Sequence, residues 1–111
     1  MKTNLEALTL NVVRKMADAA EVQARKLGAD VGIAVVAADA SIFFTRSMDN
    51  VDGYLACEVM KRAQHALAGE AGQDVEIIMN AMGNLAAVAV DGADEAVNKE
   101  CVRAALSVIE A

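Results

Sequence analysis

The chain has 111 residues, of which 56% are hydrophobic, 23% charged and 3% aromatic. That length suits a single domain, and this hydrophobicity without any proline excludes a disordered, collagen-like or linker-dominated protein. The formal net charge is −6, and no cluster of lysine and arginine is interleaved with aromatic residues, which argues against nucleic-acid binding and membrane-surface binding.

The charge is uneven along the chain. Residues 1–46 carry six basic and five acidic side chains, whereas residues 47–111 carry four basic and eleven acidic ones, a net charge of −7. The start of the chain lacks the basic segment and apolar run of a signal peptide, and no apolar stretch reaches the length of a membrane span. We therefore expect a cytoplasmic protein.

The first half of the chain predicts a helix followed by two strands. Apolar residues spaced by three and four predict a helix over 8–27, with Thr9 as its N-cap and Gly28 directly after its end. The apolar run 31–37 predicts a strand that is buried on both faces. A second strand is predicted over 42–46, and the short connection between the two indicates an antiparallel hairpin.

The second half repeats this pattern in the order helix, two strands, helix. Apolar periodicity predicts helices over 52–68 and 94–110, the last one capped by Asp94. Between them, 75–79 and 85–90 are predicted as a second hairpin. The predicted order is α-β-β-α-β-β-α in one domain, an α+β fold with a central antiparallel sheet flanked by helices.

The predicted helices and strands carry many small apolar side chains. Alanine and valine dominate these elements, and such smooth surfaces pack closely against another copy of the same chain. We expect a homo-oligomer, at least a dimer.

Several short segments occur in an order and at a spacing that resemble the GlcG/HbpS family, which includes the C-terminal domain of PduO-type proteins. The segments that carry the resemblance are Leu8–Leu10, Ala19–Gly28, Val31–Val36, Arg62–Ala66, Ala86–Gly92 and Asn98–Leu106. The resemblance covers roughly residues 8–70 and 83–110. The resemblance identifies residues 1–111 as a single, shortened GlcG/HbpS-like domain.

The resemblance implies a profilin-like fold and, because several members of this family bind haem, a haem-binding or accessory role. Three features depart from the family pattern. The first hairpin turn has Asp39, alanine and Ser41 in place of glycines, the glycine-rich segment before the last strand is largely missing, and Arg62 and His65 replace the family's lysine and threonine. A smaller or altered pocket follows if that pocket depends on these loops.

His65 is the only histidine and therefore the first candidate for ligation of haem iron or a metal. Cys57, Lys61 and His65 step by four along the predicted helix and share one face, and Lys61 is placed to approach a haem propionate. Cys57 and His65 are about 12 Å apart along that helix, too far to bind one metal ion. The alternative for His65 is a surface histidine near a subunit interface.

Tyr54, at the start of the same helix, is a further cofactor-binding candidate, and its alternative is an amphipathic residue at a helix boundary. The methionines offer thioethers to haem iron, but they also serve as core gap-fillers. Cys57 and Cys101 are expected as small buried residues in helices, with an interhelical disulfide as the alternative. The identity of a metal, if there is one, stays open.

No nucleophile elbow, phosphate-binding loop or metalloprotease motif is present. The nearby aspartate pairs Asp49 with Asp52 and Asp91 with Asp94 lie beside predicted helix starts, where capping explains them better than acid–base chemistry. We therefore expect no catalytic residues, and a non-catalytic protein that binds a small ligand, with haem or another tetrapyrrole as the most specific candidate. The alternatives are a homo-oligomeric interaction module without a ligand pocket and a small enzyme acting on a carbonyl or hydroxyacid metabolite.

Overall fold

A computed structural model describes residues 1–70, 72 and 74–110. The elements follow the predicted order α-β-β-α-β-β-α, which confirms the expected α+β fold. Their bounds are α1 Leu10–Lys26, β1 Gly32–Ala37, β2 Phe43–Ser47, α2 Gly53–Leu67, β3 Val75–Asn80, β4 Gly83–Asp91 and α3 Glu95–Ser107.

The four strands form one antiparallel sheet in the order β2-β1-β4-β3. Each predicted hairpin is present, and the two hairpins join through β1 and β4, with Ala34 opposite Ala89 and Val35 opposite Val88. The central strands β1 and β4 therefore have a neighbouring strand on both sides, and every residue of β1 is buried, as its unbroken apolar sequence predicts.

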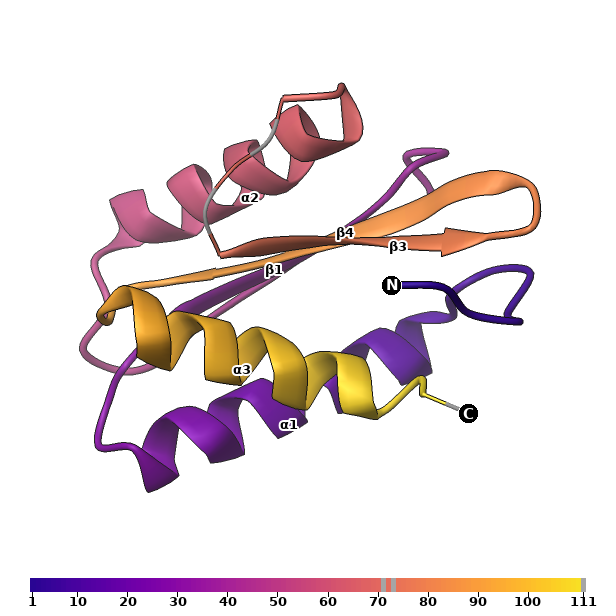
Figure 1. Ribbon diagram of the computed structural model, residues 1–111. Helices are drawn as coiled ribbons and strands as arrows, with labels where there is room; N and C mark the ends of the chain where they lie inside the picture. Colours follow the sequence, from indigo (N-terminus) through magenta and orange to yellow (C-terminus); the bar gives the residue numbers. More distant parts are fainter. Residues whose placement is uncertain (71, 73, 111) are drawn as a thin grey trace.

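The helices cover both faces of the sheet (Figure 1). α2 lies alone on one face, and α1 and α3 lie side by side on the other. The larger core cluster fills the space between the sheet and the α1–α3 pair, and includes Met16, Ile33, Ile78 and Val88. A smaller cluster under α2 is built around Val59 and Ala63.

Local sequence signals set the helix ends. The side chains of Thr9, Asp52 and Asp94 accept the backbone N–H groups of Val12, Tyr54 and Val97, which confirms the predicted caps. Gly28 follows α1 with a φ of 68°, a conformation that glycine adopts without strain.

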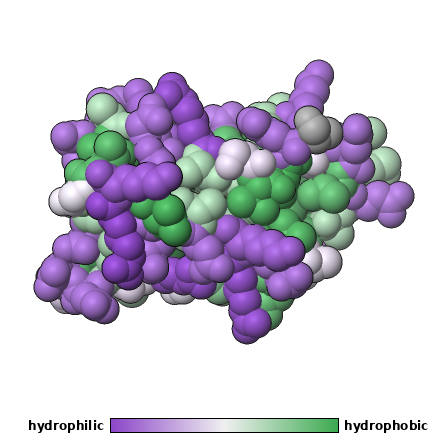
Figure 2. All heavy atoms as spheres, turned by 90° about the horizontal axis from the view of Figure 1, so that it is seen from below, coloured by the Kyte–Doolittle hydropathy of each residue, from purple (hydrophilic) through white to green (hydrophobic). Residues whose placement is uncertain are grey.

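Some side-chain placements differ from the predicted stripes. Leu10 and Leu27 belong to the apolar periodicity that predicts the first helix, yet at its two ends they are 47% and 45% exposed. Figure 2 looks onto the α1 and α3 face and shows apolar patches separated by hydrophilic side chains. Among the residues that the structure describes, no helix combines the length and the apolar character that crossing a bilayer requires.

Candidate functional site

All three side chains predicted from the sequence to bind a ligand lie on the outer face of α2. Val59 and Ala63 point into the sheet and are fully buried, so residues on the opposite side of the helix face solvent. Tyr54, Lys61 and His65 lie on that solvent-facing side and are exposed.

His65 lies near the end of α2, where the chain turns back toward it. Its imidazole Nδ1 is 3.7 Å from Oε2 of Glu70, and its side chain is 63% exposed. No other partner of the imidazole occurs among the described residues. Lys61 lies one turn earlier on the same face, with a rise of about 6 Å between the two residues. The face therefore offers one accessible imidazole nitrogen and one ammonium group side by side.

Tyr54 is 81% exposed and lies at the opposite end of α2. Eleven residues separate it from His65, a rise of about 16 Å, so the phenol and the imidazole cannot reach one iron atom. Cys57 was expected to be buried, and this is wrong: it is exposed, because the apolar stripe of α2 turns away from it, whereas Cys101 is buried as expected. Both cysteines are free, so the alternative of an interhelical disulfide is wrong too.

The described residues contain no group of three or more histidine, cysteine or acidic side chains that could hold a metal ion. The hollows found in the described part of the chain are lined by other residues than Tyr54, Lys61 and His65. If a haem bound on this face, His65 would supply an imidazole nitrogen for the iron and Lys61 would supply a cation, but no described hollow encloses the two side chains. The donor atoms fit haem, and the enclosing wall must come from elsewhere.

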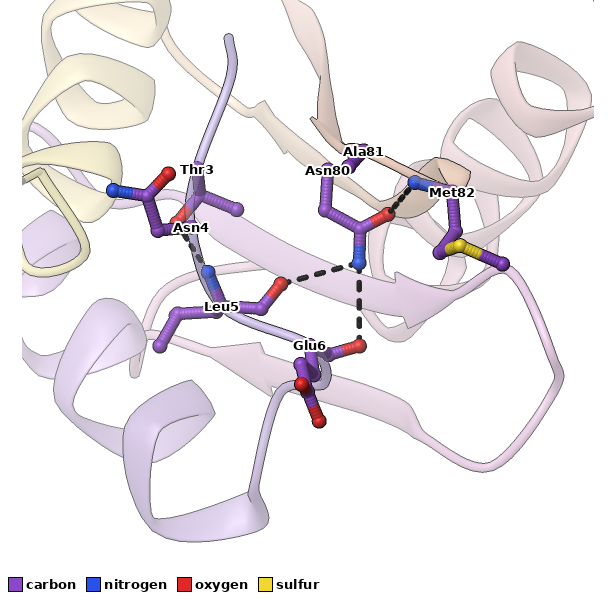
Figure 3. A pocket seen from close by; sticks show the side chains of 7 residues that line it. All are labelled: Thr3, Asn4, Leu5, Glu6, Asn80, Ala81 and Met82. Carbon is purple, nitrogen blue, oxygen red and sulfur yellow. Dashed lines mark hydrogen bonds between the residues drawn. The ribbon is translucent and has the colours of Figure 1, made fainter.

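A hollow of about 460 Å³ lies between the segment Thr3–Glu6 and the β3–β4 turn (Figure 3). Asn80 holds the two walls together, because its Nδ2 donates to the carbonyl oxygens of Leu5 and Glu6 at 3.1 and 3.2 Å, and its Oδ1 accepts the N–H of Met82 at 2.9 Å. Figure 3 shows these bonds.

Met82 lines this hollow at the tip of the turn and is 94% exposed. It differs from Met48, which is buried and whose sulfur accepts the N–H of Val31 at 3.3 Å, so that Met48 belongs to the core. The sequence analysis treated the methionine thioethers as one group and did not separate these two. The hairpin turn predicted over 80–84 was the signal that could have placed Met82 at the surface.

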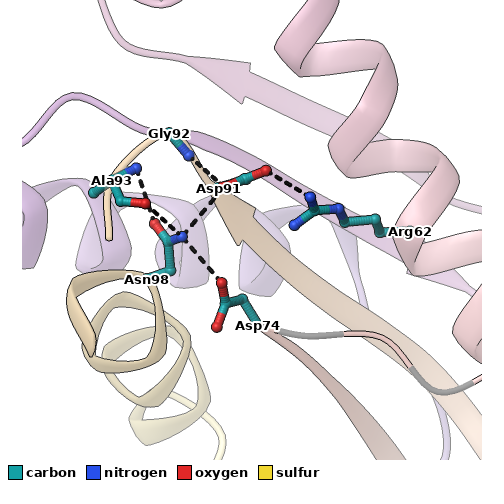
Figure 4. A network of polar contacts seen from close by, with 6 residues as sticks. All are labelled: Arg62, Asp74, Asp91, Gly92, Ala93 and Asn98. Carbon is teal, nitrogen blue, oxygen red and sulfur yellow. Dashed lines mark hydrogen bonds and ion pairs between the residues drawn. The ribbon is translucent and has the colours of Figure 1, made fainter. Parts of the chain in front are cut away.

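A network of polar side chains joins α2, β4 and α3 at one end of the sheet (Figure 4). Arg62 Nη2 lies 2.9 Å from Oδ2 of Asp91. Asn98, only 1% exposed, donates from Nδ2 to Asp74 Oδ2 at 3.0 Å, to Asp91 Oδ1 at 3.2 Å and to the carbonyl oxygen of Ala93 at 3.0 Å.

This network is structural. The second carboxylate oxygen of Asp74 is buried without a hydrogen-bond partner among the described atoms, so no ligand can reach it without a rearrangement. Sequence reasoning missed Asn98. The available signal was its spacing of three and seven from Cys101 and Ala105, which places a polar side chain on the buried stripe of α3.

No protein-family model and no curated protein sequence matches the chain. Several solved structures do match along almost the whole chain. A complex of PduOC with haem has 16% sequence identity and a TM-score of 0.80 over 94% of this chain and 96% of that one. The protein ORFY of Klebsiella pneumoniae has 16% identity and a TM-score of 0.82 over 96% and 92%. A double mutant of HbpS from Streptomyces reticuli has 20% identity and a TM-score of 0.79 over 98% and 91%.

PduOC and HbpS are the proteins that the sequence resembles, so the fold that the resemblance implies is confirmed. At these identities the likeness establishes the fold, and the ligand must be argued from this chain's own residues.

Proposed function

We propose that this chain is a non-catalytic, single-domain accessory protein that binds a small ligand of the haem or tetrapyrrole class on the outer face of α2. The observation that carries this proposal is the match along almost the full length to PduOC, a protein solved in complex with haem. The exposed His65 and Lys61, one helical turn apart, supply the chemistry that such a ligand needs.

In this proposal His65 would hold the haem iron through its imidazole nitrogen. The contact of Glu70 is at Nδ1, so Nε2 is free to face an iron atom. Lys61 provides a cation for a propionate in a chain whose net charge of −6 otherwise repels anions. When bound, haem supplies an iron atom that takes up such a nitrogen. Tyr54, at the far end of α2, covers the rim of the ligand rather than its centre.

One chain leaves the second face of a planar ligand open, so the proposal includes a homo-oligomer in which another copy covers that face. A cytoplasmic location is also part of the proposal. Two free cysteines, one of them exposed, suit a reducing compartment.

The experiment is a haem titration followed by absorbance, with wild type, His65→Ala and the neighbouring surface control Gln64→Ala. We expect saturation at one haem per chain for wild type and for Gln64→Ala, and loss or a shift of the Soret band for His65→Ala. Because His65 is on the surface, His65→Ala keeps the wild-type circular dichroism spectrum. Lys61→Gln weakens binding without moving the band, since the lysine contacts no iron.

Absence of saturable binding by wild type overturns the ligand proposal. The second candidate function, an interaction module without a ligand, then takes its place. That candidate is favoured by a specific observation, namely that the described hollows lie away from the outer face of α2.

A further inference from the structure

The strand β2 forms an open edge of the sheet. Its alternate residues bond to β1, as the bonds from Ala37 N–H to the Ile42 oxygen at 2.9 Å and from Met48 N–H to the Val31 oxygen at 3.1 Å show at its two ends. The intervening residues therefore direct their backbone N–H and C=O groups away from the sheet. These residues are Phe43, Thr45 and Ser47, and no backbone bond to their outward groups occurs within the described part of the chain.

The opposite edge, β3, is partly closed. Lys2 forms a parallel bridge with Met79, the Met79 N–H donates to the Met1 oxygen at 2.7 Å, and the Thr3 N–H donates to the Met79 oxygen at 2.8 Å. β3 also carries the partly exposed Glu76. An added strand meets an occupied ladder and a negative charge there, so β2 is the edge that is free to pair.

The exposed side chains of β2 do not protect it. Edge strands are normally shielded from pairing by charged residues, proline or a covering segment. The residues whose backbone groups point outward, Phe43, Thr45 and Ser47, have uncharged and exposed side chains, and Phe43 is 48% exposed. Arg46, the one charge on β2, forms an ion pair with Asp18 of α1 on one face of the sheet.

We infer that β2 pairs antiparallel with β2 of a second copy of this chain, centred on Thr45, so that two four-stranded sheets become one continuous sheet. In this register Thr45 faces Thr45 of the second copy and Phe43 faces Ser47. All outward N–H groups of each β2 then meet a C=O group of the other. A register shifted by two residues leaves outward groups unpaired, which selects the central one.

Side-chain chemistry supports the same register. Phe44 lies opposite Arg46 of the second copy, in the closely spaced type of cross-strand pair. Within one chain the Arg46 guanidinium already lies 5.6 Å from the centre of the Phe44 ring, so each ring gains a second cation of the same kind. The exposed Phe43 is covered by the neighbouring strand.

Charge and nearby apolar surface are compatible with this contact. Residues 43–47 contain no acidic side chain, and residues 1–46 carry six basic against five acidic side chains, so two copies meet here without opposing carboxylates. Val22, one helical turn after Asp18 on α1, is 51% exposed and adds apolar surface beside the edge. The inference concerns the apo protein and does not rest on haem binding.

The test is the mass of the protein in solution, measured by light scattering at tens of micromolar without ligand. We expect a dimer for wild type and for Thr45→Val, which keeps the N–H and the side-chain shape. Thr45→Pro removes an N–H that bonds nothing within the monomer, so it keeps the fold and raises the dimer dissociation constant about tenfold or more.

A second variant covers the case in which Thr45→Pro fails to fold. Thr45→Lys places two like charges directly opposite each other, so it also favours the monomer, and high salt restores the dimer by screening. A monomeric wild type overturns the inference, and so does a folded Thr45→Pro or Thr45→Lys variant that dimerises like wild type. Haem titration of the same samples keeps this result separate from the proposed function.

Discussion

The buried amide of Asn98 predicts a strong and pH-dependent effect of a single-atom change. Asn98→Asp replaces the NH₂ group that donates to Asp74 and Asp91 with an oxygen, so three carboxylates share a buried site. Two unit charges 3 Å apart repel by about 5 kcal/mol at an effective dielectric constant of about 20. Total stabilities are only about 5–15 kcal/mol, so we expect Asn98→Asp to lose at least about 3 kcal/mol at neutral pH.

The loss of stability caused by Asn98→Asp is expected to increase as the pH rises. The folded variant takes up a proton within the carboxylate cluster more readily than the unfolded chain, so its stability falls as the pH rises. We expect the difference from wild type to shrink between neutral pH and about pH 5. Asn98→Ala removes the donor without adding a charge, so it costs about 2–4 kcal/mol and lacks this pH dependence.

Urea denaturation measures these differences as shifts of the midpoint at an unchanged slope. The matched control is Asn50→Asp, because the Asn50 amide also donates to a carboxylate, Asp30 Oδ2 at 3.0 Å, but at an exposed position. We expect the control to cost less than about 1 kcal/mol. An Asn98→Asp variant as stable as wild type at neutral pH would refute the reasoning.

Further predictions concern glycine geometry and thiol chemistry. Gly92 has a φ of 117°, and an added Cβ lies 2.9 Å from the Asp30 oxygen, so Gly92→Ala costs about 2–4 kcal/mol in a urea melt. Gly53→Ala meets nothing within 4 Å and leaves the melt unchanged, and equal effects of the two would contradict this geometry. A thiol reagent titrates one group per native chain, Cys57, and two after unfolding, whereas two native thiols would be inconsistent with the buried position of Cys101. Burial raises the pKa of the Cys101 thiol from 9.0 to about 11. The contribution of this thiol to the free energy of unfolding is therefore complete below pH 9 and decreases from pH 9 to 11, because the thiol ionises in the unfolded chain but not in the folded one. Urea midpoints across this range measure the decrease, and Cys101→Ala removes it.

The fold was predictable from the sequence because its signals are local. The helix caps, the apolar periodicity and the short hairpin connections each act within a few residues, and they predicted the order of the elements and the caps correctly. The joining of the hairpins through β1 and β4 depends on long-range packing, which no local signal carries. Ala40 shows the same limit, because its φ of 63° is imposed by the hairpin and not indicated by its residue type.

The candidate site was only partly predictable. Helical spacing placed Lys61 and His65 on one face correctly, since that face depends on α2 alone. The position of Tyr54 relative to any pocket, and the hollow beside Met82, depend on how distant segments meet. Asn80 illustrates why, because its amide joins the β3–β4 turn to the segment before α1, 75 and 74 residues away.

The most direct test of ligand binding on α2 is an NMR titration of labelled protein with gallium protoporphyrin, a diamagnetic analogue of haem. We predict amide shift changes concentrated in residues 54–68, saturating at one ligand per chain and absent from His65→Ala. Changes confined to the hollow between Thr3–Glu6 and Asn80–Met82, or no saturable change at all, would contradict the proposed site.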